Sequence, residues 1–206
     1  MQLAAHEAHD LNELILSCVN TITNMSLFLN QVRDPELRAI LERHFPMHVR
    51  DYNVKVEYAR NAQGPSTVLP IPKLNYNVCT QMQQYTGSYP SATPRMDGNH
   101  FDDREIATAY LLTLKRAGRE YAWSAFETMT PQLRSFLEDA FRMNSHHAYE
   151  VWQWMARRGY YPVENANNKL MQTMGQMYQV IPENQQWWDQ STQLYQQNQQ
   201  NQPNQF

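Results

Sequence analysis

Histidines at helical spacing are the side chains of this sequence best suited to chemistry. His44 and His48 stand four residues apart, which would place both rings on one face of a helix, where they could hold one metal ion. His147 and Glu150 stand three residues apart later in the chain and would also share one face of a helix. The candidate ligands are therefore His44, His48, His147 and Glu150. Zinc needs three or four convergent ligands. We favour hydrogen-bonded interior or surface histidines and expect no bound metal or cofactor.

Carboxylates do not form a convincing catalytic pattern. Di-metal carboxylate bundles use Glu-x-x-His pairs, and this sequence contains none. Glu42 and Glu138 fall beside the apolar stripes of their segments, and Phe45 and Phe141 take the expected inward positions. No Gly-rich phosphate loop, nucleophile elbow or Ser/His/Asp arrangement is recognisable. The sequence predicts no catalytic residue, and a metal-dependent oxidase remains the alternative.

The remaining polar candidates have structural explanations. Cys18 and Cys79 form neither a disulfide framework nor a metal-binding spacing. Cys18 is expected to face His48 across the first pair of helices. Acidic and histidine side chains also gather where helices should begin, and we interpret them as charges that favour helix N-termini. They are His6, Glu7, His9 and Asp103.

Composition excludes several classes of protein. The net charge is −3 with a sequence pI near 6.1, and no stretch is rich in basic residues, so nucleic acid is not an expected partner. No run approaches the ~20 apolar residues of a membrane span. The first residues lack a basic start and an apolar run, so we expect no signal peptide and synthesis in a cytoplasm.

Apolar residues recur at helical spacing in four long segments, which predicts an all-α protein. The segments are 4–32, 35–62, 102–130 and 131–159. Their predicted inward residues are Leu11, Ile15, Cys18, Ile22, Met25 and Leu29; Leu37, Leu41, Phe45, His48, Tyr52 and Val56; Ile106, Tyr110, Leu114, Ala117, Tyr121 and Ala125; and Leu133, Leu137, Phe141, Ala148, Val151 and Met155. Pro46 should kink the second helix, because proline removes a backbone hydrogen bond.

The two halves of the chain repeat each other. Residues 34–47 and 130–143 match at seven of fourteen positions with a constant offset of 96 and no gap. The same offset places Leu16 on Leu112 and Glu7 on Asp103. We interpret this as a duplication in which hairpins 4–62 and 102–159 close into one four-helix bundle. The connection 63–101 is long enough to cross the bundle, which favours a ferritin-like order of helices.

The second hairpin resembles a known family. The ordered series is Asp103, Ile106-Ala107-Thr108, Lys115, Tyr121-Ala122, Glu127-Thr128, Pro131 to Arg134 and Met155 to Tyr161. It is similar to the coat protein F family, ferritin-like proteins of the spore coat of endospore-forming bacteria. The resemblance is dense over about sixty residues and implies a structural, non-catalytic protein. It also implies deposition in the spore coat from the mother-cell cytoplasm, with other spore coat proteins or further copies of the chain as partners.

The C-terminal part differs in composition from the bundle. We expect a bundle domain over 1–162 and an extension over 163–206, with a short amphipathic helix and then a Gln/Asn-rich tail. Such a tail cannot bury enough apolar surface to fold alone. Aromatic residues in the predicted loops and tail would suit contacts with other proteins. They are Tyr85, Tyr89, Tyr160, Tyr161, Trp187, Trp188, Tyr195 and Phe206.

Overall fold

The computed structural model describes residues 2–65, 68–72, 87–96, 98–182 and 192–194. It divides the chain into two units, Met1–Val163 and Glu164–Phe206, which are described separately. The residues outside the described part include Cys79, Tyr85, Trp187, Trp188, Tyr195 and Phe206. Most of the predicted tail and residues 66–67, 73–86 and 97 of the predicted crossover also lie outside it.

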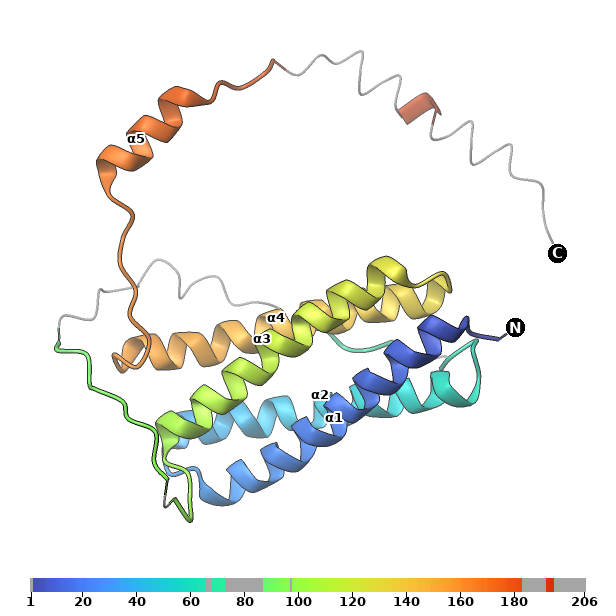
Figure 1. Ribbon diagram of the computed structural model, residues 1–206, viewed down its shortest axis with the longest axis horizontal. Coiled ribbons are helices and arrows are strands. Elements are labelled where there is room, and N and C mark those ends of the chain that lie inside the picture. Colours follow the sequence, from blue (N-terminus) through green and yellow to red (C-terminus); the bar gives the residue numbers. More distant parts are fainter. Residues whose placement is uncertain (1, 66–67, 73–86, 97, 183–191, 195–206) are drawn as a thin grey trace. The chain divides into compact units, whose positions relative to one another are not determined.

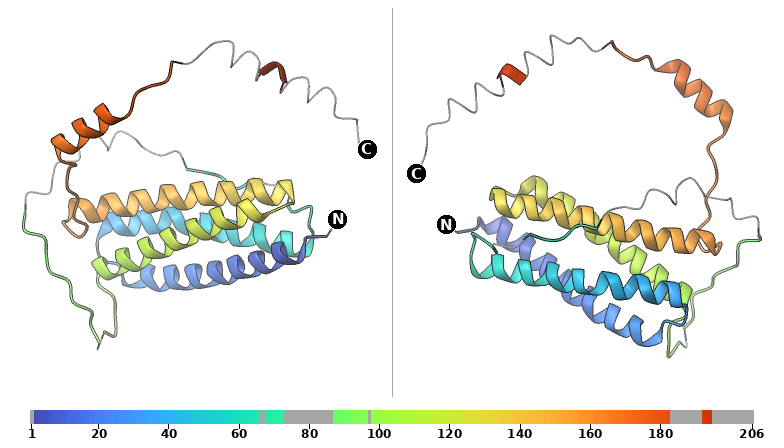
Figure 2. Two further views of the ribbon diagram at one scale, coloured as in Figure 1. Left: turned by 45° about the horizontal axis from the view of Figure 1, so that its top comes forward. Right: turned by 180° about the vertical axis from the view of Figure 1, so that it is seen from behind.

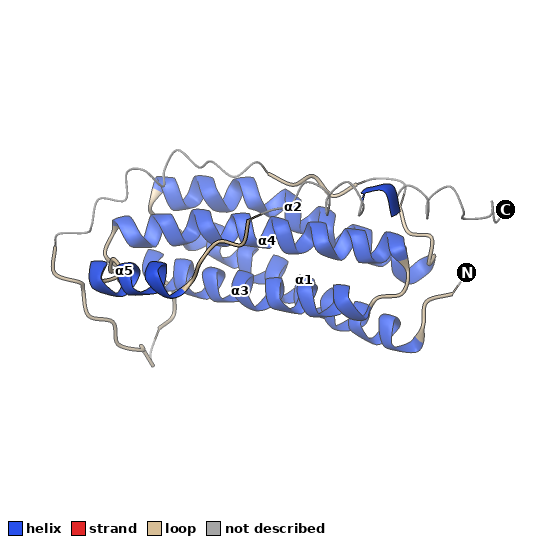
Figure 3. Ribbon diagram, turned by 90° about the horizontal axis from the view of Figure 1, so that it is seen from above, coloured by secondary structure: helices blue, strands red, loops and turns tan. Residues whose placement is uncertain are grey.

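Regular structure in the described residues is entirely helical, and the predicted all-α class is confirmed (Figure 3). The elements are α1 (Ala5–Gln31), α2 (Pro35–Arg60), α3 (Asp103–Glu127), α4 (Pro131–Arg157) and α5 (Asn168–Met177). Helix α2 continues through Pro46. No helix within this described part is long and apolar enough to cross a membrane.

Helices α1 to α4 lie side by side in the first unit (Figures 1 and 2). Each helix packs against two others, in the pairs α1 with α2, α3 with α4, α1 with α3, and α2 with α4. Helices α2 and α3 begin at the same end of the unit. The chain must therefore return along the whole length of the unit between the end of α2 and the start of α3.

A buried carboxylate holds the turn between α3 and α4. Glu7, near the start of α1, is 2% exposed. Its Oε1 accepts hydrogen bonds of 2.8 Å from the backbone N–H groups of Met129 and Thr130. Its Oε2 accepts from the N–H of Ala4 at 2.7 Å and from the Thr130 hydroxyl at 3.2 Å. Backbone donors that the turn would otherwise leave without partners are thereby satisfied.

The turn between α1 and α2 is held in the same way from the other half of the chain. Asp103, at the start of α3, accepts from the N–H of Arg33 at 2.8 Å and from the N–H of Asp34 at 3.1 Å. The offset of 96 residues that relates the two halves converts this contact into the one made by Glu7. The two hairpins thus clamp each other's turns reciprocally.

An arginine in each half repeats a second contact. Arg38 Nη2 donates to the carbonyl of Val32, and Arg134 Nη2 donates to the carbonyl of Thr128, both at 2.7 Å. These residues are also related by the offset of 96. Both arginines satisfy carbonyl groups at the C-terminal end of the preceding helix, where helices leave acceptors without partners.

Two apolar clusters fill the interior, one toward each end of the unit. The first is built around Met25, Leu37 and Trp154, and the second around Leu14, Val54 and Leu137. Between them, at the middle of the helices, lies a layer of buried polar side chains. Its members are Cys18, Thr21, His44, His48, Asp51, Lys55, Tyr110, Tyr121, Asn144 and His147.

The prediction that phenylalanines occupy the inward positions after Leu41 and Leu137 is wrong for Phe141, whereas Phe45 packs against the first apolar cluster. Phe141 is 42% exposed, and Phe45 is only partly buried. The buried stripe advances by three residues at this point, so that His44 and Ala140 point inward instead. Because a helix has 3.6 residues per turn, steps of three and four both stay on one face.

The second unit contains α5. The side chain of Asn167 caps this helix by accepting from the N–H of Lys169 at 2.8 Å. Its apolar residues are all exposed, including Leu170, Met171 and Met174. A helix of this length is marginal in isolation.

Replacing Glu7 with Gln should lower the free energy of unfolding by about 1–3 kcal/mol, because an amide cannot accept all four hydrogen bonds that the carboxylate receives. The measurement is urea unfolding followed by circular dichroism. Glu13→Gln, an exposed change on the same helix, is the control and should stay within about 0.5 kcal/mol of the parent. Equal stability of both variants would contradict the clamp.

Candidate functional site: the buried polar layer

The three interior histidines meet in one cluster. The ring of His44, on α2, stacks on the ring of His147, on α4, with centroids 3.6 Å apart and an interplanar angle of 11°. His48 meets the ring of His147 edge-on at 5.2 Å. We call these residues, with Tyr110 of α3 and Glu150 of α4, the histidine cluster. All four predicted candidate ligands therefore belong to it.

Hydrogen bonds fix the orientation of His44. Its Nε2 lies 3.1 Å from Glu150 Oε2, which also accepts from Arg43 Nη2 at 2.8 Å. An ionised carboxylate only accepts, so His44 Nε2 carries the proton and Nδ1 is left as an acceptor. That nitrogen lies 3.1 Å from the Tyr110 hydroxyl, which is also 2.9 Å from His48 Nε2. The tyrosine thus donates to His44 and accepts from His48.

Burial keeps these histidines neutral. It lowers the pKa of His48 to about 4 and lowers those of His44 and His147 below their ordinary value of 6.5. The hydrogen bond from His44 lowers the pKa of Glu150 to about 2, with Arg43 adding to the effect. Neither ring nitrogen of His147 has a hydrogen-bond partner among the described residues.

The geometry does not suit a metal ion. A histidine binds metal through a lone pair in the plane of its ring, and the parallel planes of His44 and His147 prevent these lone pairs from converging on one point. Tyr110 and Glu150 already occupy the nitrogens of His44. Within the described residues, no three His, Cys, Asp or Glu side chains are arranged to hold a metal. The carboxylates that a di-metal bundle requires are likewise not gathered here.

A second buried group lies next to the histidines along the bundle. Lys55 Nζ, which is fully buried, contacts Asp51 Oδ1 at 2.6 Å, the Tyr121 hydroxyl at 2.7 Å and Cys18 Sγ at 3.2 Å. Asp51 Oδ2 accepts from the Tyr121 hydroxyl at 2.6 Å and from the Cys18 thiol at 3.1 Å. We call these four residues the lysine cluster. It links α1, α2 and α3.

The lysine cluster holds an ion pair away from water. Burial would raise the pKa of Asp51, but the charge of Lys55 and the surrounding hydrogen bonds outweigh it and lower this pKa. Burial raises the pKa of Cys18 to about 12 and that of Tyr121 well above its ordinary value. The thiol therefore stays protonated and is not a nucleophile, since the thiolate is the reactive form.

Sequence reasoning missed the lysine cluster. It paired Cys18 with His48, and this contact is not made. Cys18 contacts Asp51 instead, while His48 contacts Tyr110. The available signal was the i, i+4 pair of Asp51 and Lys55 with Asp51 three residues beyond His48, on the same helical stripe.

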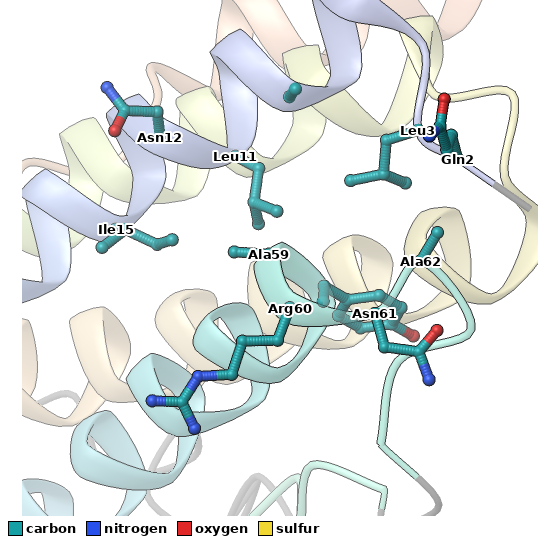
Figure 4. A pocket seen from close by; sticks show the side chains of 11 residues that line it. Gln2, Leu3, Leu11, Asn12, Ile15, Ala59, Arg60, Asn61 and Ala62 are labelled. Carbon is teal, nitrogen blue, oxygen red and sulfur yellow. The ribbon is translucent and has the colours of Figure 1, made fainter.

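The largest cleft described among these helices lies away from both clusters. A cleft of about 510 Å³ lies between the start of α1 and the end of α2 (Figure 4). Leu3, Leu11, Ile15 and Ala59 form its apolar wall, and Arg60 is its charged residue. None of the clustered histidines, acids or the lysine lines it. The polar layer is arranged to join helices.

The chain resembles known proteins over the second hairpin and over most of its length. Residues 102–164 match the model of the Coat F domain. The chain is also 26% identical, over 183 residues, to the spore coat protein F-like protein YhcQ of Bacillus subtilis (strain 168), covering 84% of this chain and 82% of that protein. The resemblance to the coat protein F family is therefore confirmed.

A solved structure shares the fold. It is that of a protein from Bacillus halodurans C-125, provisionally called a spore coat protein. It matches with a TM-score of 0.59 over 82% of this chain and 97% of the other, at 11% identity. At 11% identity, the match shows only that the two proteins share an arrangement of helices.

Acid should destabilise the bundle through the histidine cluster. The pKa of His48 is about 4 in the folded protein and 6.5 in the unfolded chain, so the unfolded chain binds the proton first as the pH falls. The stability that this histidine contributes above pH 6.5 is therefore lost as the pH falls toward 4. For His48 this loss is about 3 kcal/mol. The measurement is the urea midpoint at several pH values. The His48→Gln variant should show a weaker dependence of the urea midpoint on pH, whereas the exposed His9→Gln variant should behave like the parent. Parallel curves for the parent and both variants would contradict the role of His48.

Removing Lys55 alone should be severe. Lys55→Met leaves the Asp51 carboxylate buried without its cation and should cost about 3–5 kcal/mol in the free energy of unfolding. Adding Asp51→Asn removes the orphaned charge and should restore a large part of that loss. The same substitution at exposed Lys169 is the control. A double variant less stable than Lys55→Met would show that the pair is not coupled.

Proposed function

We propose that this protein is a structural, non-catalytic component of the spore coat, deposited there from the mother-cell cytoplasm. The observation that carries the proposal is the Coat F match over the second hairpin, joined to an interior whose charged and titratable groups mostly bind one another. Buried side chains that form hydrogen bonds and ion pairs with one another join the helices and are not available to bind a substrate.

The proposed architecture is a ferritin-like four-helix bundle over 1–162, made from two duplicated hairpins, with a crossover over 63–101 and an extension over 163–206. The reciprocal turn clamps of Glu7 and Asp103 support the duplication. The common starting end of α2 and α3 supports the ferritin-like order, which has one long crossover.

Assembly would use exposed aromatic and amide-rich surface. Trp123 and Phe126 of α3 are 72% and 81% exposed, and Tyr178 in the second unit is 71% exposed. Aromatic side chains of this kind provide large contact area with little loss of conformational freedom. Other spore coat proteins and further copies of this chain are the proposed partners, with no role for nucleic acid.

A metal-binding protein remains the second candidate, because His147 has two buried ring nitrogens without partners among the described residues. In that case His44, His48, His147 and Glu150 would have to reorient before they could act as ligands. The stacked geometry of the rings speaks against this function.

Fractionation of sporulating cells tests the structural role. A tagged chain expressed from its own promoter should appear late in sporulation and be recovered with extracted coat material. Elemental analysis of the protein purified without chelator is the second measurement, and it should find less than one metal equivalent per chain. Two equivalents that disappear in a His48→Gln, His147→Gln variant would establish the metal function, and a protein confined to the soluble fraction would refute the coat assignment.

A further inference from the structure

A continuous chain of hydrogen bonds leads from a half-buried carboxylate to a phenol in the interior. The Glu150 side chain, which is 32% exposed, accepts from His44 Nε2 at 3.1 Å. On the other side of the same ring, His44 Nδ1 accepts from the Tyr110 hydroxyl at 3.1 Å. Tyr110 is 1% exposed, and its oxygen also accepts from His48 Nε2 at 2.9 Å. We call Tyr110, His44 and Glu150 the proton path, because each can pass a proton to the next.

Packing of the bundle does not require this polar chain. The corresponding positions in the other half of the sequence are apolar and buried. The offset of 96 relates Tyr110, His44 and Glu150, in that order, to Leu14, Ala140 and Val54. These three residues belong to the second apolar cluster. Burying polar groups costs free energy that apolar side chains do not incur, so packing alone does not explain the proton path.

A phenol in this setting can lose an electron and a proton together. Burial raises the pKa of Tyr110 well above its ordinary value of 10, and the charge of Glu150 adds to the effect. The phenolate therefore does not form, and the proton leaves only when an electron is removed as well. Neutral His44 offers an acceptor for that proton at 3.1 Å. The resulting imidazolium lies 3.1 Å from the Glu150 carboxylate, which balances its charge.

The second tyrosine of the polar layer lacks these conditions. The Tyr121 hydroxyl donates to Asp51 Oδ2 at 2.6 Å and accepts from Lys55 Nζ at 2.7 Å. A proton passed to Asp51 would neutralise the carboxylate that pairs with Lys55 and leave that cation buried without its partner. Since an uncompensated buried charge is strongly destabilising, Tyr121 should resist the same oxidation.

Aromatic side chains connect this part of the interior with the surface. Trp154 lies in the same apolar cluster as Tyr110, and the partly buried Tyr160 packs against that cluster. The ring centroids of Trp154 and Tyr160 are 5.8 Å apart. An oxidant at the surface can therefore remove an electron from Tyr110 through neighbouring rings, without entering the interior.

We propose that Tyr110 is a site of reversible one-electron oxidation. A one-electron oxidant, such as a peroxyl radical, takes one electron from the phenol. The O–H bond breaks at the same time, and its proton moves to His44 Nδ1. The products are a neutral phenoxyl radical, an imidazolium paired with Glu150, and the reduced oxidant. A one-electron reductant such as ascorbate returns the electron, and the proton then moves back from His44. This activity goes beyond the coat function and does not depend on it.

Flash photolysis of the full chain with a photogenerated ruthenium(III) complex as one-electron oxidant, in the presence of a chelator, tests the oxidation. Electron paramagnetic resonance should detect a long-lived tyrosyl radical in the parent protein, and ring-deuterated tyrosine should narrow its spectrum. Tyr110→Phe should lose this radical. Tyr121→Phe, the matched buried control, should retain it, with circular dichroism confirming that both variants fold. A radical that survives in Tyr110→Phe, or a parent protein without a long-lived tyrosyl radical, would overturn the inference.

The proton path has a separate readout. In D₂O the radical should form several-fold more slowly, because the transferred proton is then a deuteron. Glu150→Gln removes the charge that balances the imidazolium and should also slow the oxidation several-fold, whereas Glu138→Gln, an exposed change on the same helix, should not. Equal rates in the parent and Glu150→Gln proteins, or no effect of D₂O, would reject the path. Neither result bears on the coat assignment, which the fractionation of sporulating cells tests by itself.

Discussion

A charged lysine and a charged aspartate buried side by side constrain the rest of this structure. Lys55 and Asp51 have no access to water, and each charge is stable there only while its partners remain in place. Those partners come from α1 and α3, through Cys18 and Tyr121. The pair therefore fixes the register of three helices, because a shift of one turn would leave a charge unpaired in an apolar interior.

The histidine cluster completes this layer from the fourth helix. His147 of α4 stacks on His44, and Glu150 of α4 orients the same ring. Apolar contacts alone tolerate sliding, since they depend little on direction. Hydrogen bonds are directional, and those at the middle of the helices prevent such sliding. The carboxylates of Glu7 and Asp103 do the same at the two turns. These buried polar contacts thus hold the four helices in one rotation and register.

Much of the fold could be predicted from the pattern of residues in the sequence. The helices, the starts at Asp34 and Asp102 and the offset of 96 between the halves were predictable, because capping residues, proline and apolar spacing act over a few neighbouring residues. The grouping of His44, His48, His147 and Glu150 as one candidate set was also within reach. Phe141 was wrongly predicted to point inward, because steps of three and four residues are equally helical.

Local sequence by itself determined which segments are helices, where they begin and end, and that they form two related pairs. Tertiary structure alone decided which polar side chains meet: that Cys18 contacts Asp51 and not His48, that Lys55 is an interior residue, and that the rings of His44 and His147 stack. The physical reason is that helix formation depends on neighbours in sequence, whereas the pairing of buried charges depends on the rotation and register of helices distant in sequence, which only the packed interior fixes.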